Sequence, residues 1–326
     1  MNDPAPKTYT WQSLHPAARR TFYFIGVTTG SSSIRRVFPL WAEHLELGDV
    51  ELVGIDLAIH APDEHYRTVV EFIKNDPLSL GALVTTHKID LYNAAKDLFD
   101  EIDPLATLMS EVSSLSKRDG SLRADAKDPI SSGLAIEAFL PQDHFTQAGT
   151  DLVIFGAGGS AVAIDWYLSD PRRAGNRPEQ ITVTNRSRPR LDTLEAVHRA
   201  AGRELPVRTV LADRPEINDE VLATARPGSL VINATGLGKD APGSPLTDER
   251  RFPERAIAWD LNYRGDLLFL DQAREQQLDR RLQVEDGWIY FIHGWTQVIA
   301  EVFDVEIPVS GPDFDELSRL AGGTRR

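Results

Sequence analysis

The sequence predicts an α/β protein of two domains, the second of which has the pattern of a dinucleotide-binding fold. Three observations lead to this prediction. The chain has 326 residues, more than a single hydrophobic core usually organises. Apolar, strand-like runs alternate with helix-like segments along most of its length, which predicts parallel sheets. Finally, residues 151–164 (DLVIFGAGGSAVAI) pass from an apolar run through three glycines into helix-forming residues.

Composition and charge limit the classes of function. Hydrophobic residues make up 41% and charged residues 26% of the chain, which is typical of an ordered globular protein. The net charge of -14 argues against nonspecific binding to nucleic acid or to an anionic membrane. It still leaves room for a local basic pocket that binds a phosphate.

The absence of cysteine excludes disulfides, a thiolate nucleophile and a cysteine-ligated metal, and we expect no metal site. Residues 1–7 lack the apolar core of a signal peptide, and no apolar run approaches the length needed to span a bilayer. We therefore expect a cytoplasmic protein.

The first half of the chain begins with a polar segment, residues 1–20, that we expect to pack late as an arm. Alternation then predicts strands at 21–27, 51–57 and 79–84 and helices at 34–47, 62–75 and 89–99. Pro39 should kink the first of these helices. Arg118-Asp-Gly120 between the short runs 112–116 and 121–124 predicts a hairpin. Residues 128–133 then open a helix at 134–140.

The second half repeats the alternation. It predicts strands at 151–155, 180–184, 229–233, 256–261 and 282–285, and helices at 267–276 and 287–303. The helix at 287–303 is apolar and rich in aromatic residues, so it could return to the first domain. A weak helix is expected within residues 311–326.

The glycine-rich stretch has two interpretations. Gly156, Gly158 and Gly159 suit a tight strand-to-helix turn, and Ser160 could cap a helix whose N-terminal amides face a pyrophosphate. Glycine turns also join strands to helices for steric reasons alone, so the pattern needs support from elsewhere in the chain.

That support comes from the end of the next strand, at Asn185-Arg-Ser-Arg-Pro-Arg190. In NAD-binding enzymes an acidic residue at this place usually binds the ribose 2′-hydroxyl, and this chain has none here. Arg186, Arg188 and Arg190 instead stand where a 2′-phosphate would lie, and guanidinium groups bind phosphate well. A solvated basic turn would explain the arginines but not their position, so the sequence favours NADP over NAD.

Taken together and in this order, the loops resemble the shikimate dehydrogenase family, which includes quinate/shikimate and related cyclitol dehydrogenases. The resemblance covers about residues 21–305. In the cofactor half, Gly156-Ala-Gly-Gly-Ser160 resembles the family's glycine turn, and Asn185-Arg-Ser187 with Arg190 resembles its NADP loop. Asn233-Ala-Thr-Gly-Leu-Gly238 is similar to Asn-Ala-Thr-x-x-Gly, and Asp260 with Tyr263 to Asp-x-x-Tyr.

The resemblance implies a division into a substrate-binding catalytic domain, residues 1–130 with about 287–326, and an NADP-binding Rossmann domain, residues 131–286. It also implies a set of cofactor-binding residues: Gly156, Gly158, Gly159, Ser160, Asn185, Arg186, Ser187, Arg190, Asn233, Thr235 and Gly238.

The family's catalytic pair is implied by two further motifs. Thr85-Thr-His-Lys88 resembles Val-Thr-x-Pro-x-Lys, one residue shorter and without the proline, so that Lys88 falls on the catalytic lysine. Ala124-Asp-Ala-Lys-Asp128 resembles Gly-x-Asn-Thr-Asp, so that Asp128 falls on the paired aspartate. Taken singly, Lys88 could be a solvated lysine at a helix start and Asp128 a simple helix cap. The nucleotide-binding pattern downstream favours the catalytic interpretation of the pair.

The substrate half departs from the family pattern. Ser31-Ser-Ser-Ile-Arg35 stands in place of His-Ser-x-Ser-Pro, Leu83 replaces an asparagine, and Ser113 replaces another. The family's Gly-x-x-Met-Leu-x-x-Gln becomes Gly287-Trp-Ile-Tyr-Phe-Ile-His-Gly294, so that the glutamine is lost. Either His293 or Gly294 takes its place, depending on a shift of one residue, and His293 is either a substrate contact or an interior histidine. The residues expected to bind the substrate are Ser32, Ser33, Thr85, Ser113, Tyr263 and His293.

These changes predict an NADP-dependent oxidoreductase for a ring alcohol or ketone related to shikimate, quinate or a cyclitol, but not for shikimate itself. Each buried polar contact that is lost without replacement weakens binding by about 1–3 kcal/mol. Two alternatives stay open. One is a true shikimate dehydrogenase in which Arg35 or Arg36 binds the carboxylate, and the other is a nucleotide-binding sensor that has lost the reaction. The expected partner is a small polar cyclic substrate, with no nucleic acid and no membrane, and the chain is expected to be a monomer or a homodimer.

Overall fold

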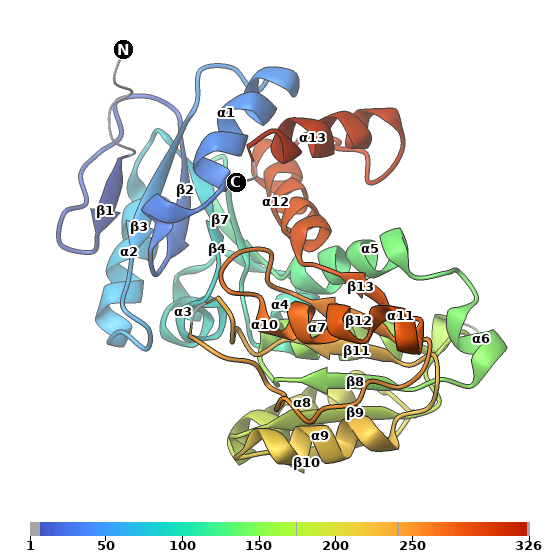
Figure 1. Cartoon of the computed structure of the whole chain (residues 1–326). Helices are drawn as coiled ribbons and strands as arrows, with labels where there is room; N and C mark the ends of the chain where they lie inside the picture. Colours follow the sequence, from blue (N-terminus) through green and yellow to red (C-terminus); the bar gives the residue numbers. More distant parts are fainter. Residues whose placement is uncertain (1–6, 174, 240, 325–326) are drawn as a thin grey trace. The chain divides into compact units, whose positions relative to one another are not determined.

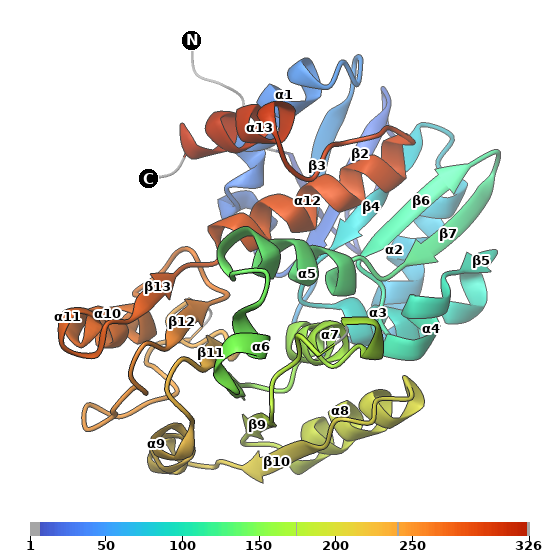
Figure 2. The same ribbon diagram turned by 90° about the vertical axis from the view of Figure 1, so that its right-hand side faces the viewer.

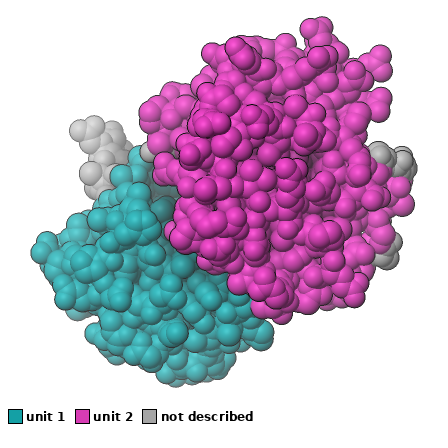
Figure 3. All heavy atoms as spheres, turned by 90° about the horizontal axis from the view of Figure 1, so that it is seen from below, with its two compact units in different colours: residues 1–127, 292–326 teal, residues 128–291 magenta. Residues whose placement is uncertain are grey.

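The computed structural model describes residues 7–173, 175–239 and 241–324, and residues 1–6 of the expected N-terminal arm lie outside these ranges. The chain divides into two compact units, which Figure 3 colours separately: residues 1–127 with 292–326, and residues 128–291. Each unit contains its own sheet with helices on both faces, so the fold is α/β, as the alternation of apolar runs predicts.

The first unit is built on a mixed sheet that has seven strands in the described part of the chain, in the order β1-β3-β2-β4-β6-β7-β5. Its strands are β1 (Thr8–Thr10), β2 (Thr21–Gly26), β3 (Glu51–Asp56), β4 (Ser79–Val84), β5 (Glu101–Ile102), β6 (Ser114–Arg118) and β7 (Ser121–Asp125). β1 to β4 pair in parallel, whereas β6 runs antiparallel to both β4 and β7. Asp119 and Gly120 make the turn of this hairpin, both at positive φ.

Helices cover both faces of the first sheet (Figures 1 and 2). They are α1 (Ile34–His44), α2 (Asp63–Asn75), α3 (Lys88–Ala95), α4 (Pro104–Met109), most of α12 (Trp288–Phe303) and α13 (Pro312–Gly322). Tyr66 of α2 and Leu91 of α3 belong to one core with Ile25 and Ile55 of the sheet. On the other face, Phe22 packs edge-on against Trp295 of α12, with ring centroids 6.2 Å apart.

The second unit is built on a sheet with six strands in the described residues, all parallel, in the order β10-β9-β8-β11-β12-β13. The strands are β8 (Leu152–Phe155), β9 (Ile181–Asn185), β10 (Val207–Leu211), β11 (Leu230–Asn233), β12 (Ile257–Asp260) and β13 (Gln283–Glu285). Counted from β8, this is the 3-2-1-4-5-6 order of the Rossmann fold, and the order reverses between β8 and β11.

Helices also cover both faces of the second sheet (Figure 1). They are α5 (Asp128–Phe139), α6 (His144–Ala148), α7 (Gly159–Leu168), α8 (Arg188–Ala200), α9 (Pro215–Thr224), α10 (Leu268–Glu275) and α11 (Gln277–Arg280). Leu222 of α9 and Phe269 of α10 bury one face of the sheet together with Phe155. Gly133 of α5 allows this helix to approach α7, because a Cβ there would lie 2.3 Å from the ring of Tyr167.

Most of the expected elements form, and the differences have local causes. Residues 128–133, expected to open the helix at 134–140, already belong to it, because Pro129 suits the first turn of a helix and the serines that follow are buried in it. The expected arm contains β1, which pairs with β3 at the sheet edge. Strand β10 lies in a polar, half-exposed segment, VRTVL, whose pattern was too weak to predict it.

Candidate functional site

The turn after β8 lies where the order of the second sheet reverses, and its first glycine is required by the fold. Gly156 has φ +108°, and a Cβ there would lie 2.5 Å from the backbone oxygen of Ala234 in the loop after β11. Gly158 is different, because it has an ordinary extended conformation and a Cβ would meet no described atom within 4 Å. The chain itself therefore does not require glycine at 158, whereas a pyrophosphate drawn close to the backbone would.

Ser160 does not cap the helix, contrary to the sequence-based expectation. Helix α7 begins at Gly159, and the N-cap position is occupied by Gly158, which has no side chain. The Ser160 hydroxyl instead lies 3.0 Å from the hydroxyl of Tyr290. Tyr290 in turn donates a hydrogen bond of 3.4 Å to Oδ2 of Asp128, the residue expected to act in catalysis. Asp128 is 5% exposed.

The basic turn after β9 separates its arginines into two kinds. Asn185 closes the turn by accepting a hydrogen bond of 2.9 Å from the Ser187 amide, and α8 begins at the next residue. Arg188 is committed to its own helix, through Asp192 at 2.9 Å and Glu195 at 3.0 Å. Arg186 is exposed, and within the described residues it has no ion pair, as is also true of Arg190.

The loops after β11 and β12 are joined by a hydrogen bond between side chains. Asn233 donates to Oδ2 of Asp260 over 3.0 Å, and its own side-chain oxygen accepts from the amide and hydroxyl of Thr235. Burial raises the pKa of Asp260 to about 6, although bonds from Asn262 and Asn233 oppose the shift. Gly238, at φ +88°, closes the first loop through a bond from its amide to Ala241. Asn233 and Thr235 thus fix the shape of the loop with their side chains.

In the first unit, Lys88 is the first residue of α3, directly after the loop that leaves β4. Lys88 is half-buried. Its backbone oxygen accepts a hydrogen bond from the Val112 amide, and its backbone amide donates to the backbone oxygen of Thr85. The Thr85 hydroxyl donates to the backbone of Ile25 over 3.2 Å. Ser113 is 2% exposed, and its hydroxyl binds the Asp125 oxygen and the Lys127 amide. The protons of both hydroxyls are therefore used within this unit.

The loop that contains Ser32 and Ser33 leads into α1. Ser32 is buried and Ser33 occupies the cap position of the helix without a side-chain capping bond. Arg35, considered as a substitute anion site, donates instead to Leu52, to Lys7 and to Thr8, at 2.9–3.2 Å. Arg36 donates to the backbone oxygen of Thr324. Both guanidinium groups therefore already have partners within their own unit.

His293 lies inside the first unit. It is 1% exposed, its ring stacks on that of Phe314 at 4.5 Å and 11°, and its Nδ1 has no hydrogen-bond partner among the described residues. Burial lowers its pKa to about 4, so the ring is neutral at pH 7. Of the two interpretations of this residue, these contacts favour the interior histidine.

Tyr263 belongs to a half-buried aromatic cluster in the second unit, after β12. Its ring lies 5.1 Å from that of Trp288 and 4.8 Å from that of Phe291. The predicted residues thus fall into two groups. Ser32, Ser33, Thr85, Lys88, Ser113 and His293 are in the first unit, and Asp128, Tyr263 and the cofactor residues are in the second.

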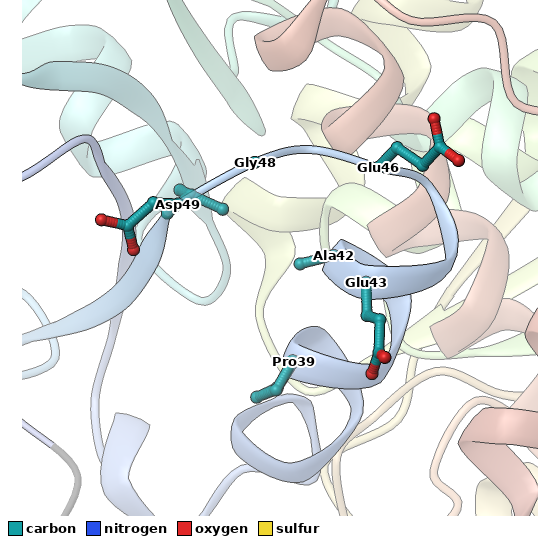
Figure 4. Close-up of a pocket in the computed structure, with 7 residues that line it drawn as sticks. Pro39, Ala42, Glu43, Glu46, Gly48 and Asp49 are labelled. Carbon is teal, nitrogen blue, oxygen red and sulfur yellow. The ribbon is translucent and has the colours of Figure 1, made fainter.

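A surface depression elsewhere in the first unit contains none of the predicted residues (Figure 4). It lies where α1 leads towards β3, and it is lined by Pro39, Ala42, Glu43, Glu46, Gly48, Asp49 and Val50. Its three carboxylates are unfavourable for an anionic cofactor.

Comparisons with known proteins agree with this fold and these motifs. No family model matches the chain. The shikimate dehydrogenase (NADP(+)) of Streptococcus thermophilus is 26% identical over 255 residues, which is 76% of this chain and 82% of that protein. That of Lactococcus lactis is 22% identical over 68% of this chain and 73% of its own. In sequence and in fold the chain is therefore similar to shikimate and quinate dehydrogenases.

Solved structures of the family have the same fold. The shikimate dehydrogenase of Aquifex aeolicus superimposes with a TM-score of 0.69 at 16% identity, over 96% of this chain and 100% of the other. The quinate dehydrogenase of Corynebacterium glutamicum, solved in complex with NAD, gives 0.69 at 19% identity, over 94% and 99%. The prediction of an open α/β domain followed by a Rossmann domain, with the last helices returning to the first, is confirmed.

No helix in the described residues is both long and apolar enough to cross a membrane. One residue near the predicted site was missed by the motifs. Tyr290 stands where the family motif has methionine, and only its hydrogen bonds to Ser160 and Asp128 reveal it.

Proposed function

We propose that this protein is an NADP-dependent oxidoreductase that acts on a secondary ring alcohol or ketone related to shikimate, quinate or a cyclitol. The observation that carries the proposal is the turn at Gly156 and Gly158, which lies at the reversal point of a 3-2-1-4-5-6 sheet. When bound, the nicotinamide supplies or accepts a hydride. The names of the curated relatives, shikimate dehydrogenase (NADP(+)), support both the activity and the cofactor.

The residues that we assign to the cofactor are the turn at 156–160, the basic turn at 185–190 and the loop at 233–238. The backbone at Gly158 and the N-terminus of α7 suit the pyrophosphate. Arg186 suits the 2′-phosphate, because it is exposed and has no ion pair in the described part of the chain, whereas Arg188 is held by Asp192 and Glu195.

We assign the acid–base chemistry to Lys88. An alkoxide that develops during ketone reduction needs a proton donor within hydrogen-bond reach, and an ammonium group provides one. In the reverse direction the neutral amine accepts the proton of the alcohol. We assign to Asp128 the role of accepting a hydrogen bond from a ring hydroxyl of the substrate. Its burial supports this role, because a carboxylate is a stronger acceptor where water is excluded.

For the substrate, we propose a ring other than shikimate. The serine and asparagine side chains that the family pattern provides are absent at Ile34 and Leu83, and Ser113 uses its hydroxyl within the chain. Arg35 does not compensate as a carboxylate site, because its donors bind backbone and side-chain oxygens of its own unit. A neutral polyol ring fits these changes better than a carboxylic acid does.

The test is a panel of shikimate, quinate and uncharged cyclitols, each with NADP and NAD, followed by absorbance of the reduced nicotinamide. We expect turnover of at least one cyclitol with NADP and a kcat/KM at least about tenfold lower for shikimate. A shikimate efficiency above that of every other compound would favour the true shikimate dehydrogenase. NADPH binding without turnover of any compound would favour the sensor.

Cofactor preference is tested with a matched pair of arginines. Arg186→Ala should weaken NADPH binding by about 10- to 100-fold and change NADH binding little, because only NADPH carries the 2′-phosphate. Arg188→Ala is the control, since its guanidinium already binds Asp192 and Glu195. Fluorescence titration gives both dissociation constants. Equal losses for NADPH and NADH in Arg186→Ala would remove the argument for NADP.

A further inference from the structure

The hydroxyl of Tyr290 lies between two parts of the proposed site in the second unit. On one side is Ser160, in the first turn of α7, with 3.0 Å between the two hydroxyl oxygens. On the other side is Oδ2 of Asp128, at 3.4 Å. The three side chains come from α12, α7 and the start of α5, so segments far apart in the sequence meet at this hydroxyl.

The tyrosine ring is held in place from its edge. It packs edge-on against Trp259, with ring centroids 6.0 Å apart and an interplanar angle of 81°. Trp259 is fully buried, and its Nε1 donates to the backbone oxygen of Asp286 over 3.1 Å. Phe139 contacts the same indole at 5.2 Å. The position of the hydroxyl is therefore set by packing and does not depend on its hydrogen bonds alone.

The number of hydroxyl protons limits which hydrogen bonds these oxygens can form at the same time. Tyr290 has one O–H, which it donates to the carboxylate of Asp128, the strongest acceptor of the three. The contact with Ser160 then requires that the serine donate its single proton to Tyr290. A pyrophosphate at the N-terminus of α7 is an anionic acceptor for that same serine proton. Ser160 cannot serve both acceptors.

We propose that Tyr290 is a positioning residue that holds the Asp128 carboxylate and competes with the cofactor pyrophosphate for the Ser160 proton. The inference rests on the proposed function, since it requires a dinucleotide at the glycine turn. Binding of the cofactor breaks the bond between Ser160 and Tyr290, and Tyr290 loses the donor that polarises its own O–H. The bond from Tyr290 to Asp128 weakens, and the carboxylate becomes available to a hydroxyl of the substrate.

Removal of the tyrosine hydroxyl should therefore strengthen cofactor binding. In Tyr290→Phe, Ser160 no longer gives up a hydrogen bond when the pyrophosphate binds, and we expect NADPH to bind about two- to fivefold more tightly. Damage to the fold would weaken binding instead. In the Ser160→Ala background the same substitution should have no effect on NADPH affinity, because the shared proton is gone. Fluorescence titration of the wild type, both single variants and the double variant measures this cycle.

A matched control comes from α7 itself. The hydroxyl of Tyr167 binds Glu137, away from the glycine turn, so Tyr167→Phe should leave NADPH affinity unchanged. Unchanged or weaker NADPH binding in Tyr290→Phe, or effects of the two substitutions that simply add, would overturn the inference. If Tyr290→Phe does not fold, Tyr290→His replaces it in the cycle. It should then leave NADPH affinity unchanged in the Ser160→Ala background, because Ser160→Ala removes the same hydrogen bond from the other side.

The second measurement is turnover of the substrate that the panel identifies. We expect Tyr290→Phe to lower kcat by about tenfold without raising the KM for NADPH, because Asp128 loses its positioning bond while the cofactor gains affinity. A purely structural role would raise KM and lower kcat together. If the wild-type chain binds no NADPH, the proposed function fails and this inference with it. If it binds NADPH and Tyr290→Phe is not tighter, only the inference fails.

Discussion

The loop after β8 in the second unit and the loop after β4 in the first both leave the carboxyl end of a parallel strand, but they offer different groups to a ligand. At Gly156 and Gly158 the loop presents backbone and no side chains. At Thr85 and His87 the side chains bind their own unit, the threonine to Ile25 and the histidine to Tyr66. Lys88 follows directly.

This difference indicates which of the two loops can change its ligand specificity through substitutions. A site made of backbone amides depends on the fold and tolerates many changes of sequence around it. A site made of side chains can change its specificity without any change of fold. The departures at Ile34 and Leu83 and the loss of the glutamine at 293–294 are of this second kind.

The largest expected effect is on turnover, and it distinguishes the role of the loop after β4 from that of the loop after β8. Lys88→Ala should lower turnover by about 10³-fold, since it removes the proposed proton donor, and it should leave NADPH affinity unchanged. Lys96→Ala is the control, because Lys96 is an exposed lysine just after the same helix. Steady-state kinetics and fluorescence titration give the two quantities. Loss of NADPH binding in Lys88→Ala would show that the division of labour is not as we propose.

The second test compares the two glycines of one turn. Gly156→Ala should destabilise the second unit by about 2 kcal/mol or more, because φ is +108° and the new Cβ meets the Ala234 backbone at 2.5 Å. Gly158→Ala should leave stability within about 0.5 kcal/mol. It should nevertheless weaken NADPH by about tenfold, because its Cβ occupies the space that we assign to the pyrophosphate.

Urea unfolding and NADPH titration of both variants decide the matter. Unchanged NADPH affinity in Gly158→Ala would mean that the pyrophosphate does not approach this residue. A Gly156→Ala variant as stable as the wild type would show that the loop after β11 can move away from the turn.

The sequence predicted what depends on local pattern. Strands β2, β4 and β8 are apolar runs bounded by turn residues, and they begin and end within a residue of their expected limits. The edge strands β1 and β10 were missed, because a strand that is exposed on one side has little apolar signal.

Contacts between distant segments could not be predicted. Ser160 has the residue type of a helix cap, and nothing in the sequence indicates that its partner is Tyr290, which is 130 residues away. The sequence allows Arg35 to be an anion-binding residue, but in the structure its guanidinium group donates to the backbone oxygen of Leu52 in β3. Whether a polar side chain is available to a ligand depends on its tertiary partners, and a motif does not contain that information.

The last test compares two of the buried histidines, His293 in the first unit and His198 in the second, whose pKa values move in opposite directions. Burial lowers the pKa of His293 to about 4. Burial alone would also lower the pKa of His198, but the hydrogen bond and charge of Asp165 at 2.8 Å outweigh it and raise the pKa. His293 is thus neutral and unpaired at Nδ1, whereas His198 binds Asp165 and the Leu205 oxygen.

The consequences for stability have opposite signs. Below its ordinary pKa of 6.5, His293 is protonated more readily in the unfolded chain than in the folded one, so stability falls as the pH drops from 6.5 towards 4. At pH 5 the loss amounts to about 2 kcal/mol. His198 contributes stability that is complete below pH 6.5 and is lost as the pH rises through its raised folded pKa.

His293→Phe should therefore make the first unit more stable relative to the wild type at pH 5 than at pH 8, and it keeps an aromatic ring against Phe314. His198→Gln should destabilise the second unit more at pH 5 than at pH 8. Hydrogen exchange measures each unit by itself: the amides of residues 292–303 of α12 and of α13 report on the first, and those of α7 and α8 on the second. A pH 5 exchange rate of α12 that is the same in His293→Phe and the wild type would mean that His293 has a solvent or substrate contact, and the substrate-binding interpretation of this residue would regain support.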